Sequence, residues 1–174
     1  MLQQITKEKF ILDATAGYRR MWENKAHPNV LYIDQRPEVS PDEIQDFRNL
    51  PYMNERFNLI VFDPPHDIRV KPSDPNSRFI KDFWFLQPET WQSDVKKGLA
   101  ECWRCLKPMG VLIFKWNTLC KKESSVRPLF PTEPLFYQIT KGNGTTKNNE
   151  SKTLWFCFMK LPVASKETKE CQSK

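Results

Sequence analysis

The chain has 174 residues, of which 39% are hydrophobic and 13% aromatic, which is enough for one domain with a buried core. Its net charge of +6 and isoelectric point near 9.1 favour an anionic partner such as nucleic acid. No apolar stretch approaches the roughly 20 residues of a membrane span, and the first residues lack the pattern of a signal peptide, so we expect a cytoplasmic protein without a membrane partner.

Short apolar runs separated by turns dominate the beginning of the chain. Residues 10–13 predict a strand, residues 14–17 a tight turn of small side chains, and residues 18–25 a helix. Residues 29–34 predict a second strand that ends in an acid. Ser40 is followed by proline and, three positions later, by glutamate, which is the form of a helix start.

The middle of the chain contains the clearest strand. Residues 44–47 predict a third strand, so the helix begun at Ser40 must be short. Residues 57–62 are an apolar run too short for a typical helix and predict a buried fourth strand, which the two prolines that follow bring to an end. Residues 67–88 carry prolines among polar and aromatic residues and predict a long mobile loop of the kind that often forms a lid.

The second half continues the alternation of helix and strand. Residues 89–106 have apolar side chains at helical spacing and predict a helix. Residues 111–116 predict a fifth strand, and residues 121–129 a short helix. Residues 135–139 and 153–159 flank a polar, glycine-containing stretch and predict a closing hairpin.

This order of elements predicts an α/β protein. We expect a doubly wound, mostly parallel Rossmann-like sheet that is closed by an antiparallel hairpin at its C-terminal end. Residues 1–161 are expected to form a single domain, and residues 162–174 a polar, disordered tail.

The five cysteines are interpreted as reduced thiols, because their number is odd and no secretion signal precedes them. Cys102 and Cys105 form a C-x-x-C, but a zinc site would need a second such pair. Cys102 also falls on the apolar face of the predicted helix. Core packing is therefore the favoured interpretation, and we expect no metal site.

Acids follow four successive predicted strands, and the carboxyl ends of parallel strands share one edge of the sheet, where such sheets bind ligands. Asp13 begins a turn of small residues that lets a ligand approach the backbone. Asp34 follows 21 positions later, close to the spacing of about 20 at which an acid meets ribose hydroxyls. An ordinary turn and a solvated surface acid are the alternatives for these two positions.

The two further acids have aromatic or proline neighbours. Asp46 can accept a hydrogen bond from an adenine amino group while Phe47 packs on the ring, although an exposed loop acid is the alternative. Asp63 begins the sequence Asp-Pro-Pro-His, which offers a carboxylate, a rigid carbonyl and a flat ring to an amino group on a planar base.

With these residues the chain resembles the class I S-adenosylmethionine-dependent methyltransferases over about residues 10–160. The Asp-Pro-Pro-His sequence resembles the (Asp/Asn)-Pro-Pro-aromatic motif of amino methyltransferases that act on adenine or cytosine in nucleic acids. Residues 12–17, 62–66 and 112–117 are similar to a small phage-associated or prophage-associated group of DNA methyltransferases.

The resemblance implies S-adenosyl-L-methionine as the cofactor. It places the methionine part at the first turn, the ribose at Asp34, the adenine at Asp46 and Phe47, and the reactive end near Asp63. The turn residues implied in binding are Asp13, Ala14, Thr15, Ala16 and Gly17.

The resemblance also implies the catalytic residues Asp63, Pro64, Pro65 and His66. The Asp63 carboxylate and the Pro64 carbonyl would each accept a hydrogen of an exocyclic amino group, which frees the nitrogen lone pair, and no metal is required. A base inside a duplex would have to leave the stack. His66 departs from the usual aromatic residue: stacking on the base is favoured, and proton acceptance or a structural role are the alternatives.

Further residues are candidates for substrate contact. Lys115, Trp116 and Asn117 follow the fifth strand at the same edge, with strand-end packing as the alternative. Cationic residues of the predicted loop are candidates for phosphate contacts, with a solvated loop as the alternative. These are Arg69, Lys71, Arg78 and Lys81.

The favoured function is methylation of a base amino group, with adenine N6 ahead of cytosine N4 and DNA ahead of RNA. A specificity subunit or a homodimer could supply sequence recognition. The alternatives are a methyltransferase of protein glutamine or of a small molecule, and a non-catalytic subunit that binds S-adenosylmethionine.

Overall fold

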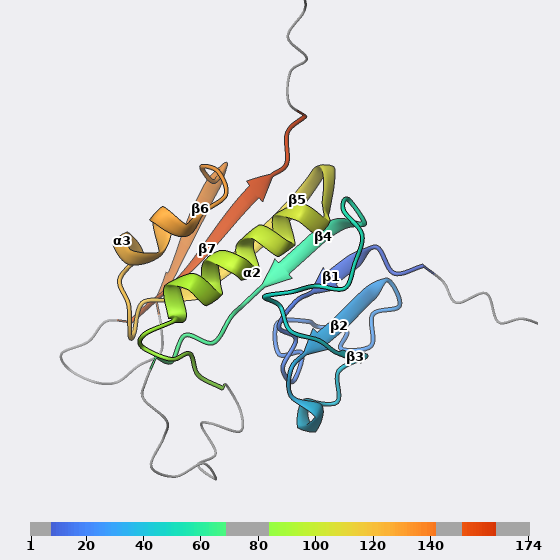
Figure 1. Cartoon of the computed structure of the whole chain (residues 1–174), viewed down its shortest axis with the longest axis horizontal. Coiled ribbons are helices and arrows are strands. Elements are labelled where there is room, and N and C mark those ends of the chain that lie inside the picture. The colour runs from blue at the N-terminus through green and yellow to red at the C-terminus, as the bar shows by residue number, and fades with distance from the viewer. Residues whose placement is uncertain (1–7, 69–83, 142–150, 163–174) are drawn as a thin grey trace, which may run out of the picture.

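The computed structural model describes residues 8–68, 84–141 and 151–162, and the statements below refer to these residues. They contain a seven-stranded mixed sheet in the order β3-β2-β1-β4-β5-β7-β6 (Figure 1). All neighbouring strands are parallel except β7, which runs antiparallel to both β5 and β6. The strands are β1 (Ile11–Asp13), β2 (Val30–Asp34), β3 (Glu43–Ile44), β4 (Phe57–Phe62), β5 (Leu106–Asn117), β6 (Phe136–Lys141) and β7 (Lys152–Met159).

This sheet confirms the predicted fold class. The strand expected over residues 57–62 has those bounds as β4, and β1 and β2 each begin one residue later than predicted. The closing hairpin forms from β6 and β7. Residues 163–174 of the predicted tail and most of the predicted loop over 67–88 lie outside the described residues.

Two predicted helices are wrong. Residues 18–25 form turns, because Gly17 and Arg19 have φ angles of 49° and 56°, in the left-handed region that a right-handed helix excludes. Ser40 is also left-handed and closes the 3-10 helix η1 (Pro37–Val39), so it ends a helical turn instead of starting a helix. The third strand, β3, lies earlier and is shorter than predicted, so both Asp46 and Phe47 follow it.

The core lies between one face of the sheet and the helix α2 (Trp91–Cys105), which crosses in front of β4 and β5 (Figure 1). Alternate strand residues point into this core, among them Phe62 and Phe114, which are fully buried. Cys102 and Cys105 are buried in the same core cluster, as their predicted packing role requires. The short helices α3 (Glu123–Val126) and η2 (Arg127–Leu129) follow β5.

The opposite face of β1 and β2 carries a smaller core. Val30 and Tyr32 of β2 are fully or almost fully buried there, and the indole of Trp22 packs edge-on against the Tyr32 ring at 5.6 Å. The turns between β1 and β2 thus occupy the place of the predicted helix. A bilayer crossing needs a long apolar helix, and the described helices, of which α2 is the longest, include none of that kind.

Helix α2 approaches the sheet so closely that only glycine fits at Gly98. A Cβ atom there would lie 2.5 Å from Cζ of Phe62 and 2.7 Å from Cδ2 of Phe47, and both rings are buried. The position of the Phe47 ring therefore depends on glycine, which has no side chain, at position 98 of α2.

We predict that Gly98→Ala destabilises the fold by about 1 kcal/mol. Overpacking of the two rings costs roughly 1–3 kcal/mol, and better helix propensity returns only about 1 kcal/mol. Urea unfolding measures the difference. Ala100→Gly, an exposed position on the same helix, is the matched control and should cost about 1 kcal/mol through propensity alone. A stabilised Gly98→Ala protein would contradict the close contact.

Candidate functional site

The turn after β1 and the Asp-Pro-Pro-His sequence after β4 are tied together at the carboxyl edge of the sheet. The amide of Ala14 donates to the carbonyl of Val61 at 2.9 Å, in continuation of the pairing between β1 and β4. The amide of Asp63 donates to Oγ1 of Thr15 at 2.9 Å. Thr15 therefore fixes where the Asp63 backbone leaves the strand.

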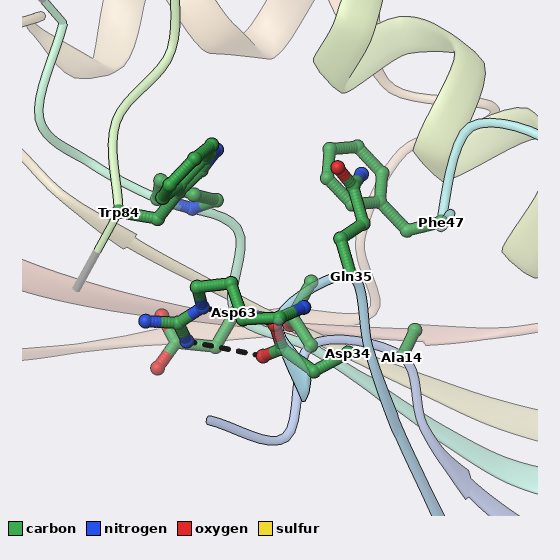
Figure 2. Close-up of a pocket in the computed structure, with 9 residues that line it drawn as sticks. Ala14, Asp34, Gln35, Phe47, Asp63 and Trp84 are labelled. Carbon is green, nitrogen blue, oxygen red and sulfur yellow. Dashed lines mark hydrogen bonds and ion pairs between the residues drawn. The ribbon is translucent and has the colours of Figure 1, made fainter. Parts of the chain in front are cut away.

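Two adjoining cavities, together called the crevice here, open at this edge. The first has a volume of about 50 Å³ and the second of about 160 Å³, and both are lined by Thr15, Arg36 and Asp63. Figure 2 shows Phe47 and Trp84 on opposite sides of the first cavity. The second cavity continues along the first turn, past Ala16, Gly17, Tyr18, Arg20, Met21 and Lys115.

Asp34 ends β2 at the crevice, as predicted, but it is held by an arginine that the sequence interpretation did not consider. Nε of Arg36 donates to Oδ1 at 2.9 Å and Nη2 donates to Oδ2 at 3.1 Å, and the dashed line that reaches Asp34 in Figure 2 belongs to this pair. Both side chains are about nine-tenths buried. The amides of Gly17 and Arg36 also donate to Asp34, at 2.9 and 3.0 Å. Asp34 is thus a fully engaged carboxylate.

Asp46 has the same arrangement one strand further out. Arg48 binds it with Nε at 2.9 Å from Oδ1 and Nη2 at 2.7 Å from Oδ2, and the Gln35 amide donates to it at 2.8 Å. Burial raises the pKa of the Asp46 carboxyl, but these hydrogen bonds and the Arg48 charge outweigh it, so the pKa lies below its usual value. Phe47 lines the crevice, whereas the Asp46 carboxylate is directed to Arg48 and Gln35.

Asp63 lies between the side chains of Lys115 and His66. Lys115 Nζ donates to Oδ2 at 2.6 Å, and His66 Nε2 lies 2.7 Å from Oδ1. That second approach is close enough for charge attraction but is not aligned as a hydrogen bond, so Oδ1 is a buried acceptor without an aligned donor among the described residues. Burial raises the pKa of Asp63, and the charges of His66 and Lys115 more than offset this, so the carboxyl stays ionised at neutral pH.

His66 itself is held on both sides. Its Nδ1 accepts a hydrogen bond from the amide of Asn117 at 3.4 Å, and its ring meets the Trp116 indole edge-on at 5.5 Å. The stacking role expected for His66 stays a prediction, and in the structure its side chain contacts Asp63, Asn117 and Trp116.

A third cavity of about 290 Å³, called the side cavity here, adjoins this network. Lys115 lines both the crevice and the side cavity, so the Asp63 network stands between them. The side cavity is lined by His66, Asp67, Lys115, Asn117, Leu119, Ser151 and Thr153. Its size is close to the lower limit of about 300 Å³ for ligand pockets.

Not every predicted site residue reaches a cavity. Trp116 is fully buried in the core, stacked on Trp91 at 5.8 Å, which corrects its assignment as a substrate contact. Asp13 is buried at 1% exposure, where it accepts hydrogen bonds from the Trp22 indole at 2.7 Å and the Thr15 amide at 3.3 Å. Asp13 therefore holds the turn. Arg69, Lys71, Arg78 and Lys81 lie outside the described residues.

The sequence interpretation missed Arg36 and Arg48. A signal for both was present, because the order Asp-x-Arg occurs at the end of two neighbouring strands and places a cation two residues after each acid. Trp84 was noted only as an apolar residue of the long loop, although it forms a wall of the crevice.

Comparison with solved structures shows the fold of the S-adenosylmethionine-dependent methyltransferases. A SAM-dependent methyltransferase from Methanosarcina mazei matches with a TM-score of 0.60 at 13% identity, over 88% of this chain and 92% of that chain. The N-methyltransferase NodS from Bradyrhizobium japonicum WM9 matches with a TM-score of 0.52 at 12% identity, over 87% and 84%. The [4+2]-cyclase SpnF matches with a TM-score of 0.53 at 11% identity, over 91% and 77%.

At these identities the likeness shows the fold, and a cyclase among the similar structures means that the fold does not decide the reaction. Neither the protein-family models nor the curated proteins compared with the sequence give a match. The reaction must therefore be argued from the side chains at the crevice.

We predict that Asp13 makes the fold less stable as pH rises towards neutrality. Burial raises the pKa of Asp13 from 3.8 to about 7, further helped by the charges of Asp63 and Asp34 and opposed by its two hydrogen bonds. The folded chain thus keeps a proton that the unfolded chain loses above about pH 4, so stability falls from there to about pH 7. Between pH 5 and 8 the loss is about 3 kcal/mol, at about 1.4 kcal/mol per pH unit.

Urea unfolding at pH 5 and pH 8 tests this prediction. Asp13→Asn should remove most of the difference between the two pH values. Asp42→Asn is the control, because the pKa of Asp42 is lowered, by hydrogen bonds and the charges of Lys9 and Arg19 that outweigh burial, and its contribution is lost only at more acidic pH. An unchanged loss in Asp13→Asn would mean that Asp13 is ionised throughout.

Proposed function

We propose that this chain transfers a methyl group from S-adenosyl-L-methionine to an exocyclic amino group of a nucleic-acid base. Adenine N6 is the favoured acceptor ahead of cytosine N4, and DNA is favoured over RNA. The observation that supports this proposal most directly is the state of the Asp63 carboxylate. Lys115 and His66 keep it ionised, and one of its oxygens has no aligned donor among the described residues. Its network stands between the crevice and the side cavity.

The crevice residues fit the proposed cofactor. An adenine ring requires apolar walls, which Phe47 and Trp84 offer, and a ribose requires a carboxylate such as Asp34. The amino-acid end requires a cationic surface, and Arg20 and Arg36 line the second cavity. When bound, this cofactor supplies an activated methyl group on a positively charged sulfur.

The chain's own residues would then prepare the acceptor nitrogen. The Asp63 carboxylate accepts one amino hydrogen and the carbonyl of Pro64 accepts the other, so the lone pair becomes less delocalised into the ring. Once the new carbon–nitrogen bond has formed, the nitrogen must lose a proton, and Asp63 is the nearest ionised acceptor. Pro65 lines the crevice and keeps the backbone of this turn rigid.

His66 and Lys115 act through Asp63. They fix the carboxylate from two sides and hold its pKa down, so that it approaches the amino group as an acceptor. The side cavity, with His66 and Asn117 in its wall, is the proposed place of the base. A base from a duplex would have to be flipped out to enter it.

Charge and motif support a nucleic-acid substrate. The net charge of +6 suits a polyanion. The Asp-Pro-Pro-His sequence resembles the motif of amino methyltransferases that act on nucleic acids, and its first residue is Asp. The similar N-methyltransferase NodS is named for transfer to nitrogen, which is the same class of acceptor atom.

The proposal predicts that Asp63→Ala lowers methyl transfer at least about a hundredfold, as loss of one strong electrostatic contact commonly does. Wild-type and variant proteins are incubated with methyl-labelled cofactor and DNA, RNA or protein, and labelled nucleosides are identified by mass spectrometry. We expect N6-methyl-2′-deoxyadenosine from DNA. Asp42→Ala, an acid outside the crevice, is the control and should keep wild-type transfer.

Two results would contradict the proposal. Unchanged transfer by a folded Asp63→Ala protein would remove Asp63 from the reaction. Label found in protein glutamine or in a small molecule, with none in nucleic acid, would replace the proposed substrate.

A further inference from the structure

The side chain of Arg36 lies where the two cavities of the crevice adjoin. It lines both of them and is itself about nine-tenths buried. A Cβ atom on Gly17 would lie 3.4 Å from Nη2 of Arg36, so the guanidinium rests against the glycine of the first turn. A ligand that extends from Phe47 to the first turn would therefore contact this side chain.

The same guanidinium occupies the carboxylate that a ribose would need. Arg36 binds both oxygens of Asp34, at 2.9 and 3.1 Å. Two vicinal hydroxyls would compete for those oxygens. The fold tolerates the departure of the Arg36 guanidinium from Asp34, because the amides of Gly17 and Arg36 continue to donate to the Asp34 carboxylate.

The displaced guanidinium needs another anion, since a buried arginine without a partner is costly. The second cavity, into which Arg36 faces, is lined by Arg20 and by the backbone turn at Gly17. A carboxylate in this cavity would stand between two arginines. Exchange of one carboxylate partner for another costs little compared with the loss of either.

We propose that Arg36 is an exchange latch: it pairs with Asp34 when the crevice is empty and with the carboxylate of the ligand's amino-acid end when a nucleoside with such an end binds. This inference rests on the proposed function, and it makes Arg36 the residue that selects between ligands of that same site. Arg36 thereby excludes nucleosides that carry no carboxylate, because they would displace it without giving it a new partner.

Calorimetry with two ligands tests the latch. S-adenosylhomocysteine carries the carboxylate, and 5′-methylthioadenosine has the same nucleoside without it. Wild-type protein should bind the first more tightly. Arg36→Met should weaken S-adenosylhomocysteine binding about tenfold or more, as expected for a lost charge-assisted pair, and should strengthen methylthioadenosine binding, because Asp34 becomes accessible.

Arg48→Met is the matched control. Arg48 binds the Asp46 carboxylate as Arg36 binds that of Asp34, but it does not line the crevice cavities. It should keep the wild-type ratio of the two affinities. Arg36→Lys, which keeps the charge, should retain the preference for the carboxylate and serves if the methionine variant does not fold.

The outcomes separate this inference from the proposed function. If Arg36→Met weakens both ligands equally, the latch is overturned while the cofactor assignment stands. If wild-type protein binds neither ligand, the cofactor assignment fails and the latch fails with it.

Discussion

Negative charge buried at one edge of the sheet is the constraint to which the rest of the site responds. Parallel pairing brings Asp13, Asp34 and Asp63 to that edge, and an uncompensated carboxylate there would be costly. Each is compensated differently. Asp13 retains a proton near neutrality, Asp34 takes a guanidinium, and Asp63 takes an ammonium and an imidazole. Among these three acids, only Asp63 has a buried oxygen without an aligned donor in the part of the chain that the structure describes, which sets it apart chemically.

The parts of the fold that depend on local sequence could be predicted. The apolar run of β4 is bounded by prolines, and the helical spacing in α2 persists over four turns, so both elements were predicted from their own residues. The helix over residues 18–25 was not, because the Trp22 indole bonds to the buried Asp13 and this tertiary contact outweighs a weak local preference. The positions of the four acids followed from strand ends, but their partners depended on how the chain turns after each strand.

The fold and the reaction rest on different observations. The fold is similar to that of a methyltransferase and of a cyclase, so the sheet provides only the edge at which side chains meet. The proposed reaction and the proposed ligand selectivity depend instead on a few side-chain atoms around Asp63 and Arg36. These are side chains that a low overall identity leaves free to differ between proteins of the same fold.

Residues 69–83 lie between two anchors that the structure does describe. Ile68 and Leu86 form an isolated parallel bridge, and the Leu86 amide donates to the Asp67 carbonyl at 2.8 Å. The departure and return points of the intervening chain are thereby clamped together beside His66. Insertions or replacements between these two anchors would leave the backbone at Asp63 and His66 in place.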